Sequence, residues 1–184
     1  MIGWILLGIL ILLVLWAVGI YNGFVGLKVR GDGAWSDIDV QLKRRYDLIP
    51  NLVETVKGYA AHEKGVFESV TQARARAMSA GTPAAKGEAE QGLAGTLKTL
   101  FAVAENYPQL RASENFQGLQ NSLGQIEEAI QSARRYYNAV VRDYNTKLAV
   151  FPDRFVAQAG HFTPKEFFQL DSAEEAKTPK VSFS

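Results

Sequence analysis

The chain has 184 residues, and its 20 Lys and Arg against 19 Asp and Glu leave a formal net charge of only +1. A surface so evenly balanced attracts nucleic acid weakly, and we expect no DNA or RNA partner. The chain has no cysteine, which excludes disulfides, a thiolate nucleophile and cysteine-bound zinc.

The first 27 residues carry no charged side chain. Residues 2–20 are almost wholly aliphatic, and about 20 such residues in a helix cross a hydrocarbon core of about 30 Å. Trp4 and Trp16 lie near the two ends, at depths that amphipathic aromatic rings favour. The sequence therefore predicts a transmembrane anchor over residues 1–27, with the lipid bilayer as its partner.

A cleaved signal peptide is the alternative, because Ala17-Val18-Gly19 resembles a small-x-small cleavage site. No basic segment precedes the apolar run, and the run is longer than those of signal peptides, so we expect a retained, single-pass anchor. The first charges beyond it are Lys28 and Arg30. The positive-inside rule then places the C-terminal domain in the cytoplasm.

Apolar residues recur at helical spacing from Trp35 to Val70. Pro50 lies within this stretch, and an interior proline removes a backbone hydrogen bond, so we expect a kink or a short break over 47–50 and then helix to about Ser79. The basic run Lys43-Arg44-Arg45 is interpreted as a solvated or salt-bridged helix face.

Residues 79–83 predict a stop and a restart, with Thr82 as the cap and Pro83 in the first turn. The helix that follows should end at Tyr107, because Pro108 disfavours helical conformation in the residue before it.

The next helix, of about 40 residues, ends at Pro152. It carries a seven-residue apolar repeat that predicts either the core of an intramolecular bundle or a coiled-coil seam between subunits. The repeat comprises Phe116, Leu119, Leu123, Ile126, Ile130, Ala133, Tyr137, Val140, Tyr144, Leu148 and Phe151.

The predicted fold is all-α: an N-terminal transmembrane helix followed by an elongated up-and-down bundle of three to four long helical segments. The anchor occupies residues 1–27, the bundle 28–152 and a C-terminal tail 153–184. Thr163-Pro164-Lys165-Glu166 matches a capping box, which predicts a short helix over 164–169. We expect the phenylalanines of the tail to dock on the bundle.

No signature of catalysis, metal binding or nucleotide binding survives inspection. His62-Glu63 begins like the zinc motif HExxH, but position 66 is Val. We therefore expect no enzyme, no metal and no cofactor.

Polar and aromatic residues cluster near the ends of the two last long helices. Asn138 and Asn145 are seven residues apart, so they share one helix face. The cluster is interpreted as a hydrogen-bonded network that fixes helix register, for which the loop near Pro108 offers backbone partners, or else as a recognition surface. Its members are Asn106, Tyr107, Tyr136, Tyr137, Asn138, Tyr144 and Asn145.

Several long motifs resemble the LemA family of bacterial membrane-anchored proteins. They are Tyr21-Asn22, the segments 34–45, 47–53, 56–60 and 104–108, Glu114-Asn115-Phe116, Arg134 with Tyr137-Asn138, Tyr144-Asn145 and Phe151-Pro152. The resemblance covers nearly the whole chain in order. It implies an anchored helical bundle in a bacterial inner membrane, and it implies no catalytic residues.

Together these features predict a membrane-anchored scaffold or adaptor that acts by self-association or partner binding, as a homo-oligomer or with a membrane protein. The alternative is a sensor domain that binds a small ligand in the bundle, lined by Tyr136, Tyr137, Asn138 and Tyr144.

Overall fold

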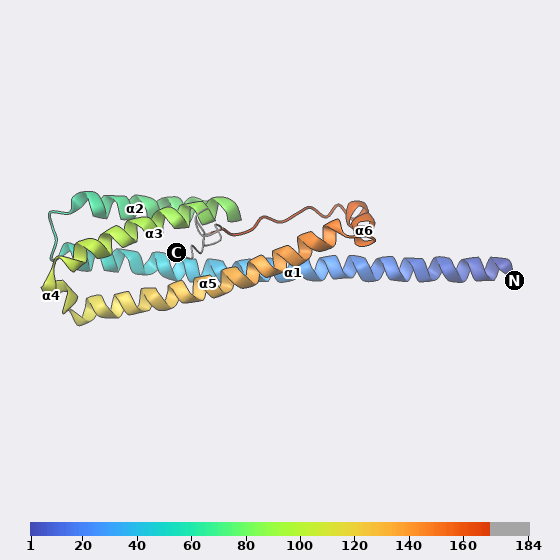
Figure 1. Ribbon diagram of the computed structural model, residues 1–184, viewed down its shortest axis with the longest axis horizontal. Coiled ribbons are helices and arrows are strands. Elements are labelled where there is room, and N and C mark those ends of the chain that lie inside the picture. The colour runs from blue at the N-terminus through green and yellow to red at the C-terminus, as the bar shows by residue number, and fades with distance from the viewer. Residues whose placement is uncertain (170–184) are drawn as a thin grey trace, which may run out of the picture. The chain divides into compact units, whose positions relative to one another are not determined.

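The computed structural model describes residues 1–169 and shows six helices in that range, with no strand (Figure 1). The predicted all-α fold class is confirmed. The helices are α1 (Ile2–Lys57), α2 (Lys64–Ser79), α3 (Pro83–Glu105), α4 (Pro108–Arg111), α5 (Glu114–Ala149) and α6 (Asp153–Ala159).

The chain divides into two compact units. Unit 1 contains Met1–Asp39 and Gln131–Phe167, and unit 2 contains Val40–Ile130 together with residues 168–169 of the described tail. The sequence predicted boundaries of another kind, at residues 27 and 152, which separate the anchor and the tail from the bundle. The division into two units does not test these boundaries, so they stay predictions.

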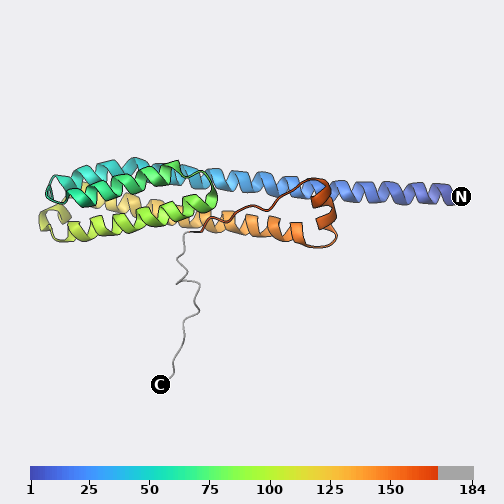
Figure 2. The ribbon, with the colours of Figure 1, turned by 90° about the horizontal axis from the view of Figure 1, so that it is seen from above.

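Unit 2 is a four-helix bundle formed by the C-terminal part of α1, by α2 and α3, and by the first part of α5 (Figure 2). Each helix turns one apolar stripe inward, as its sequence spacing predicts. The predicted restart at residue 83 is confirmed, because Thr82 Oγ1 accepts a hydrogen bond from the Ala85 amide at 3.2 Å. The core includes Leu42, Ile49, Leu52, Val56, Val70, Leu93, Leu97, Leu100, Leu123 and Ile130.

Of the kink or break predicted at Pro50, the break does not occur, because α1 continues to Lys57. A proline at position 50 has no N–H to donate to the Tyr46 carbonyl four residues earlier. That carbonyl instead accepts a hydrogen bond from Arg74 Nε of α2 at 2.8 Å. The interruption comes at residues 58–63, between α1 and α2.

Unit 1 pairs the N-terminal part of α1 with the C-terminal part of α5, and α6 covers their contact. Phe24, Tyr144 and Ala157 are buried at its centre, with Ile20, Leu27, Leu148 and Phe162 packed around them. The Phe24 ring stacks on Phe162 at 5.0 Å and meets Tyr144 edge-on at 6.1 Å.

Residues 2–19 of α1 extend beyond α5 and α6 in unit 1, and all but the half-buried Ala17 are exposed (Figure 1). By length and composition, α1 is the one candidate membrane span among residues 1–169. Phe24 belongs to the protein core, and beyond residue 19 the exposed apolar residues of α1, among them Tyr21, Val25 and Val29, share the helix with buried ones.

The tail differs from its prediction. Residues 163–169 form no helix, and the short helix of the tail is α6, which begins directly after Pro152. The predicted capping box has no helix to cap, and the Lys165 amide donates to Asn145 of α5 at 2.9 Å. Of the tail phenylalanines expected to dock, Phe162 is half-buried and Phe168 is buried, whereas Phe155 and Phe167 are exposed. Phe151, which was assigned to the apolar repeat, is exposed as well.

Gly87 of α3 lies against the backbone of the tail in unit 2. A Cβ at this position would overlap the Gln169 carbonyl oxygen and lie 3.0 Å from its carbon. We expect Gly87→Ala to displace residues 168–169 and expose Phe168, at a cost of about 1–3 kcal/mol for overpacking. Hydrogen exchange would show faster exchange of the amides at residues 168–169, and a thermal melt would show the lower stability. Gly95→Ala is the matched control, because a Cβ there meets nothing within 4 Å and improves helix propensity. Equal melting temperatures for the two variants would contradict the contact.

Candidate functional site

Five of the seven residues predicted as a network lie in unit 1, and three of these five hold the extended segment that follows α6. Asn145 forms a reciprocal pair with the Lys165 backbone: its Nδ2 donates to the carbonyl and its Oδ1 accepts from the amide, each at 2.9 Å. The Tyr137 hydroxyl donates to the Glu166 carbonyl at 2.9 Å, and its ring packs on Trp35 at 5.3 Å. The buried Tyr144 supports the same segment through Phe24 and Phe162.

Burial raises the pKa of both tyrosines. For Tyr137 the carboxylates of Glu166 and Asp32 add to the effect of burial, and for Tyr144 the carboxylate of Asp32 does. Both hydroxyls therefore stay protonated at neutral pH, which Tyr137 requires as a hydrogen-bond donor. Lys165 Nζ forms an ion pair with Asp32 Oδ1 at 2.5 Å.

The other four residues take different places. Asn106 ends α3, and its Nδ2 donates to the Ala102 carbonyl at 3.3 Å. Tyr107 precedes the short helix α4. In unit 1, Tyr136 is exposed and Asn138 is half-buried. The sequence suggested the loop near Pro108 as a partner for Asn145, whereas the structure gives it the Lys165 backbone.

We expect Asn145→Ala to release the segment at Lys165. The variant loses two hydrogen bonds worth about 1 kcal/mol each, so exchange of the Lys165 amide should accelerate roughly thirtyfold. Hydrogen exchange read by NMR measures this directly. Asn121→Ala, at an exposed position of α5, is the control and should leave that amide unchanged. An unaltered rate in Asn145→Ala would contradict the pairing.

Unit 2 contains a buried ion cluster that sequence reasoning missed. Arg45 is 3% exposed and Glu90 is 0% exposed. Arg45 Nη1 lies 2.9 Å from Glu90 Oε2, and Arg45 Nη2 lies 3.0 Å from Glu127 Oε1. The Tyr46 hydroxyl donates to Glu90 Oε1. Three helices thus contribute to one site. Arg45, which was interpreted as part of a solvated or salt-bridged helix face, is buried and pairs with α3 and α5.

Burial raises the pKa of the Glu90 carboxyl above its ordinary value. The hydrogen bond from Tyr46 and the charge of Arg45 oppose this shift, whereas the Glu127 carboxylate reinforces it. Two acids thus share one guanidinium, and Arg45 Nε has no hydrogen-bond partner among residues 1–169. The cluster is costly to keep buried unless its geometry is maintained.

A groove of about 610 Å³ between α3 and α5 opens directly onto this cluster. Arg45 lies at its floor, and Leu97, Phe101 and Leu123 provide apolar walls. Lys98, Glu105, Gln120 and Glu127 supply polar groups, while Ala94, Ala102 and Gly124 leave room between the walls. An apolar groove with a charged floor can bind one face of an amphipathic helix.

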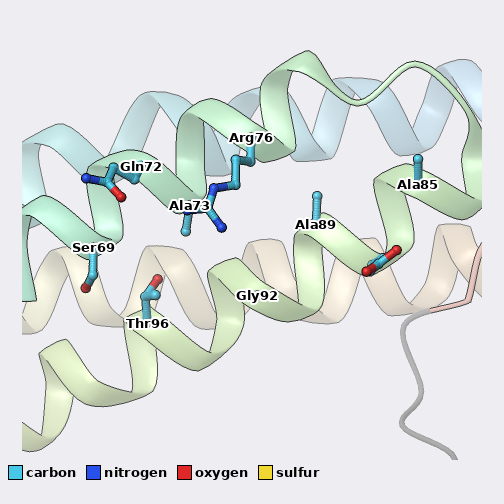
Figure 3. Close-up of a pocket in the computed structure, with 9 residues that line it drawn as sticks. Ser69, Gln72, Ala73, Arg76, Ala85, Ala89, Gly92 and Thr96 are labelled. Atoms are coloured by element: carbon cyan, nitrogen blue, oxygen red, sulfur yellow. The ribbon is translucent and has the colours of Figure 1, made fainter.

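A second groove, of about 520 Å³, lies between α2 and α3 (Figure 3). Ser69, Gln72, Ala73 and Arg76 of α2 face Ala85, Ala89 and Thr96 of α3 across it. No group of His, Asp or Glu among residues 1–169 has the arrangement needed to hold a metal ion.

Comparison with known proteins gives a family and several relatives. A sequence model of the LemA family matches residues 34–183. Two magnetosome proteins MamQ of Paramagnetospirillum magneticum are each 26% identical over 188 residues, which cover 88% of this chain and 68% of the relative. Protein LemA of Metamycoplasma hominis is 26% identical over 145 residues, covering 77% of this chain and 65% of its own length.

Proposed function

This chain belongs to the LemA family, and we propose that it is a membrane-anchored helical adaptor that acts by binding itself or a partner protein, without catalysis. The resemblance noted in the sequence is thereby confirmed. The names of the family and of the relatives specify no reaction, which supports a binding role.

One observation supports the anchor: residues 2–19 of α1 are apolar on every face, and all but the half-buried Ala17 are exposed. Exposed apolar surface of this extent is characteristic of contact with a membrane or a partner. The length matches a bilayer core of about 30 Å. The same helix, α1, continues to Lys57 and also supplies core residues of unit 2.

The groove between α3 and α5 is the proposed binding surface. Its apolar walls fit the apolar face of a helix, from a second copy of this chain or from a membrane protein. The charged floor at Arg45 favours a partner that brings a polar acceptor to the centre of the contact.

A bulky residue in this groove tests the adaptor role. Gly124→Gln fills the groove without a steric conflict, because a Cβ there meets nothing within 4 Å. Gly118→Gln is the matched control on the same helix, outside the groove. We expect Gly124→Gln to lose the covalent adducts formed by crosslinking in native membranes, or the oligomeric mass seen by light scattering in detergent, while Gly118→Gln keeps them. A monomeric wild type without crosslinked partners would overturn the proposal.

The positive charges that follow the apolar run support a cytoplasmic position for the bundle at a bacterial inner membrane. Lys28 and Arg30 are the first of them, and both are exposed.

A second candidate function is ligand sensing, which one groove in unit 1 favours. This groove, of about 480 Å³, is lined by Tyr144 together with Tyr21, Asp32, Phe162 and Lys165. Of the other residues expected to line such a site, Tyr137 is buried against Trp35. A ligand bound here raises the melting temperature by mass action, and Val29→Trp, which fills the groove, should abolish that increase. Stabilisation that persists in the variant would place the ligand elsewhere.

A further inference from the structure

The turn between α5 and α6 exposes an unusual concentration of apolar surface. Phe151 is 78% exposed, Phe155 57% and Val150 43%. The two rings meet edge-on at 5.9 Å, and the Arg154 guanidinium lies 5.4 Å from the centre of the Phe155 ring. We call Val150, Phe151, Arg154 and Phe155 the α5–α6 corner. Single exposed apolar residues are ordinary, but three in one turn beside a cation mark an interaction surface.

The register between α1 and α5 fixes the level of this corner along α1. A Cβ on Gly31 would lie 3.8 Å from Val140 Cγ1, and one on Gly23 would lie 3.3 Å from Lys147 Cε. The two helices are therefore antiparallel within unit 1, with seven residues of α5 matching eight of α1. Three more residues along α5 bring Val150 to the level of about residue 20 of α1.

Residue 20 is where the protein core ends on α1. Ile20 still packs on the cluster around Phe24, whereas residues 18 and 19 are exposed. The corner is thus within about one helical turn, 5.4 Å, of the start of the uncovered apolar run. The orientation of α6 is fixed by the ion pair of Lys147 Nζ with Asp153 Oδ1 at 2.7 Å, and by Ala157, which is buried against Phe24.

We propose that the α5–α6 corner inserts Val150, Phe151 and Phe155 into the interfacial layer of the membrane that α1 spans, with Arg154 reaching the lipid phosphates. This inference rests on the proposed anchor. Phenylalanine and valine gain free energy on leaving water, and a long arginine side chain keeps its charge at the headgroups. Attachment at α1 alone would leave unit 1 free to tilt and rotate, and a second contact restricts both motions.

Spin labels on single cysteines test the insertion, because the chain has no cysteine of its own. The full chain is reconstituted in vesicles of phosphatidylethanolamine and phosphatidylglycerol, and labels are placed at Phe151, at Leu10 and at the exposed Arg135 of α5. Collision with oxygen reports lipid, and collision with a water-soluble nickel chelate reports water. We expect labels at 10 and 151 to favour oxygen, the second at shallower depth, and the label at 135 to favour nickel.

The outcomes separate the two claims. A lipid-exposed label at 10 with a water-exposed label at 151 would contradict insertion of the α5–α6 corner but would agree with the proposed anchor. A water-exposed label at 10 would contradict both the anchor and the insertion of the corner. A label at Val150 provides the matched comparison: Phe151→Ser combined with Phe155→Ser should shift it several-fold toward nickel, with helicity unchanged because both rings are exposed. If the double variant leaves that ratio unchanged, the phenylalanines do not hold the corner in lipid.

Discussion

Ile130→Asp should unfold the bundle of unit 2. Ile130 is fully buried in the single chain, in the middle of the apolar repeat of α5. Removing a buried isoleucine side chain costs about 2–5 kcal/mol, and burying a carboxyl group without a partner adds roughly 2 kcal/mol or more. The sum is comparable to the whole stability of a typical domain, about 5–15 kcal/mol.

Thermal melts followed by circular dichroism measure this effect. Gln131→Asp, at the next and exposed position, is the control and should change stability by about 0.5 kcal/mol at most. A variant Ile130→Asp with wild-type helicity and melting temperature would mean that the repeat does not form the core.

The second large effect is expected at Glu90. Glu90→Ala removes one of the two acids that pair with the buried guanidinium of Arg45, and it leaves the Tyr46 hydroxyl without its acceptor. Breaking a buried ion pair costs about 3–5 kcal/mol, and the retained contact of Arg45 with Glu127 places our expectation at about 3 kcal/mol. Chemical denaturation measures it. Glu88→Ala, exposed on the same helix, should have little effect, and an equal loss in the two variants would contradict the role of the cluster.

Glu90 should also make stability depend on pH. Because its pKa is raised in the folded chain, the folded state binds more protons than the unfolded state between the ordinary value of 4.5 and the raised one. The contribution of Glu90 is therefore most favourable below the ordinary value, and it declines as the pH rises through that window. Glu90→Gln has no proton to release, so its melting temperature should decline less over the same range. If melting temperature changes with pH by the same slope in the wild type and in Glu90→Gln, Glu90 is not the titrating group.

Local signals allowed much of the fold to be predicted. Thr82 and Pro83 mark the start of α3 because a cap and a first-turn proline act within a few residues. Pro50 does not break α1 because the Tyr46 carbonyl accepts a hydrogen bond from Arg74, 28 residues away, and no local sequence pattern encodes that contact. The helix predicted after Thr163 does not form either, and this segment instead pairs through the Lys165 backbone with Asn145, 20 residues away.

The ion cluster carried a readable signal that was missed. Glu90 precedes Leu93 by three residues and Leu97 by seven, so it occupies the apolar stripe of α3. A carboxylate in that register calls for a buried cation, although the sequence could not say that Arg45 supplies it. For Asn145 the type of interaction was predictable, but its partner was not.

The central claim is that residues 2–19 lie in lipid while the rest of α1 supports a bundle in water. Reaction with a membrane-impermeant maleimide tests it most directly, because a thiol in hydrocarbon does not form the reactive thiolate. In detergent-free membrane fragments open on both sides, Gly33→Cys should react readily and Leu10→Cys only after detergent is added. Equal reaction of the two cysteines before detergent would contradict the account.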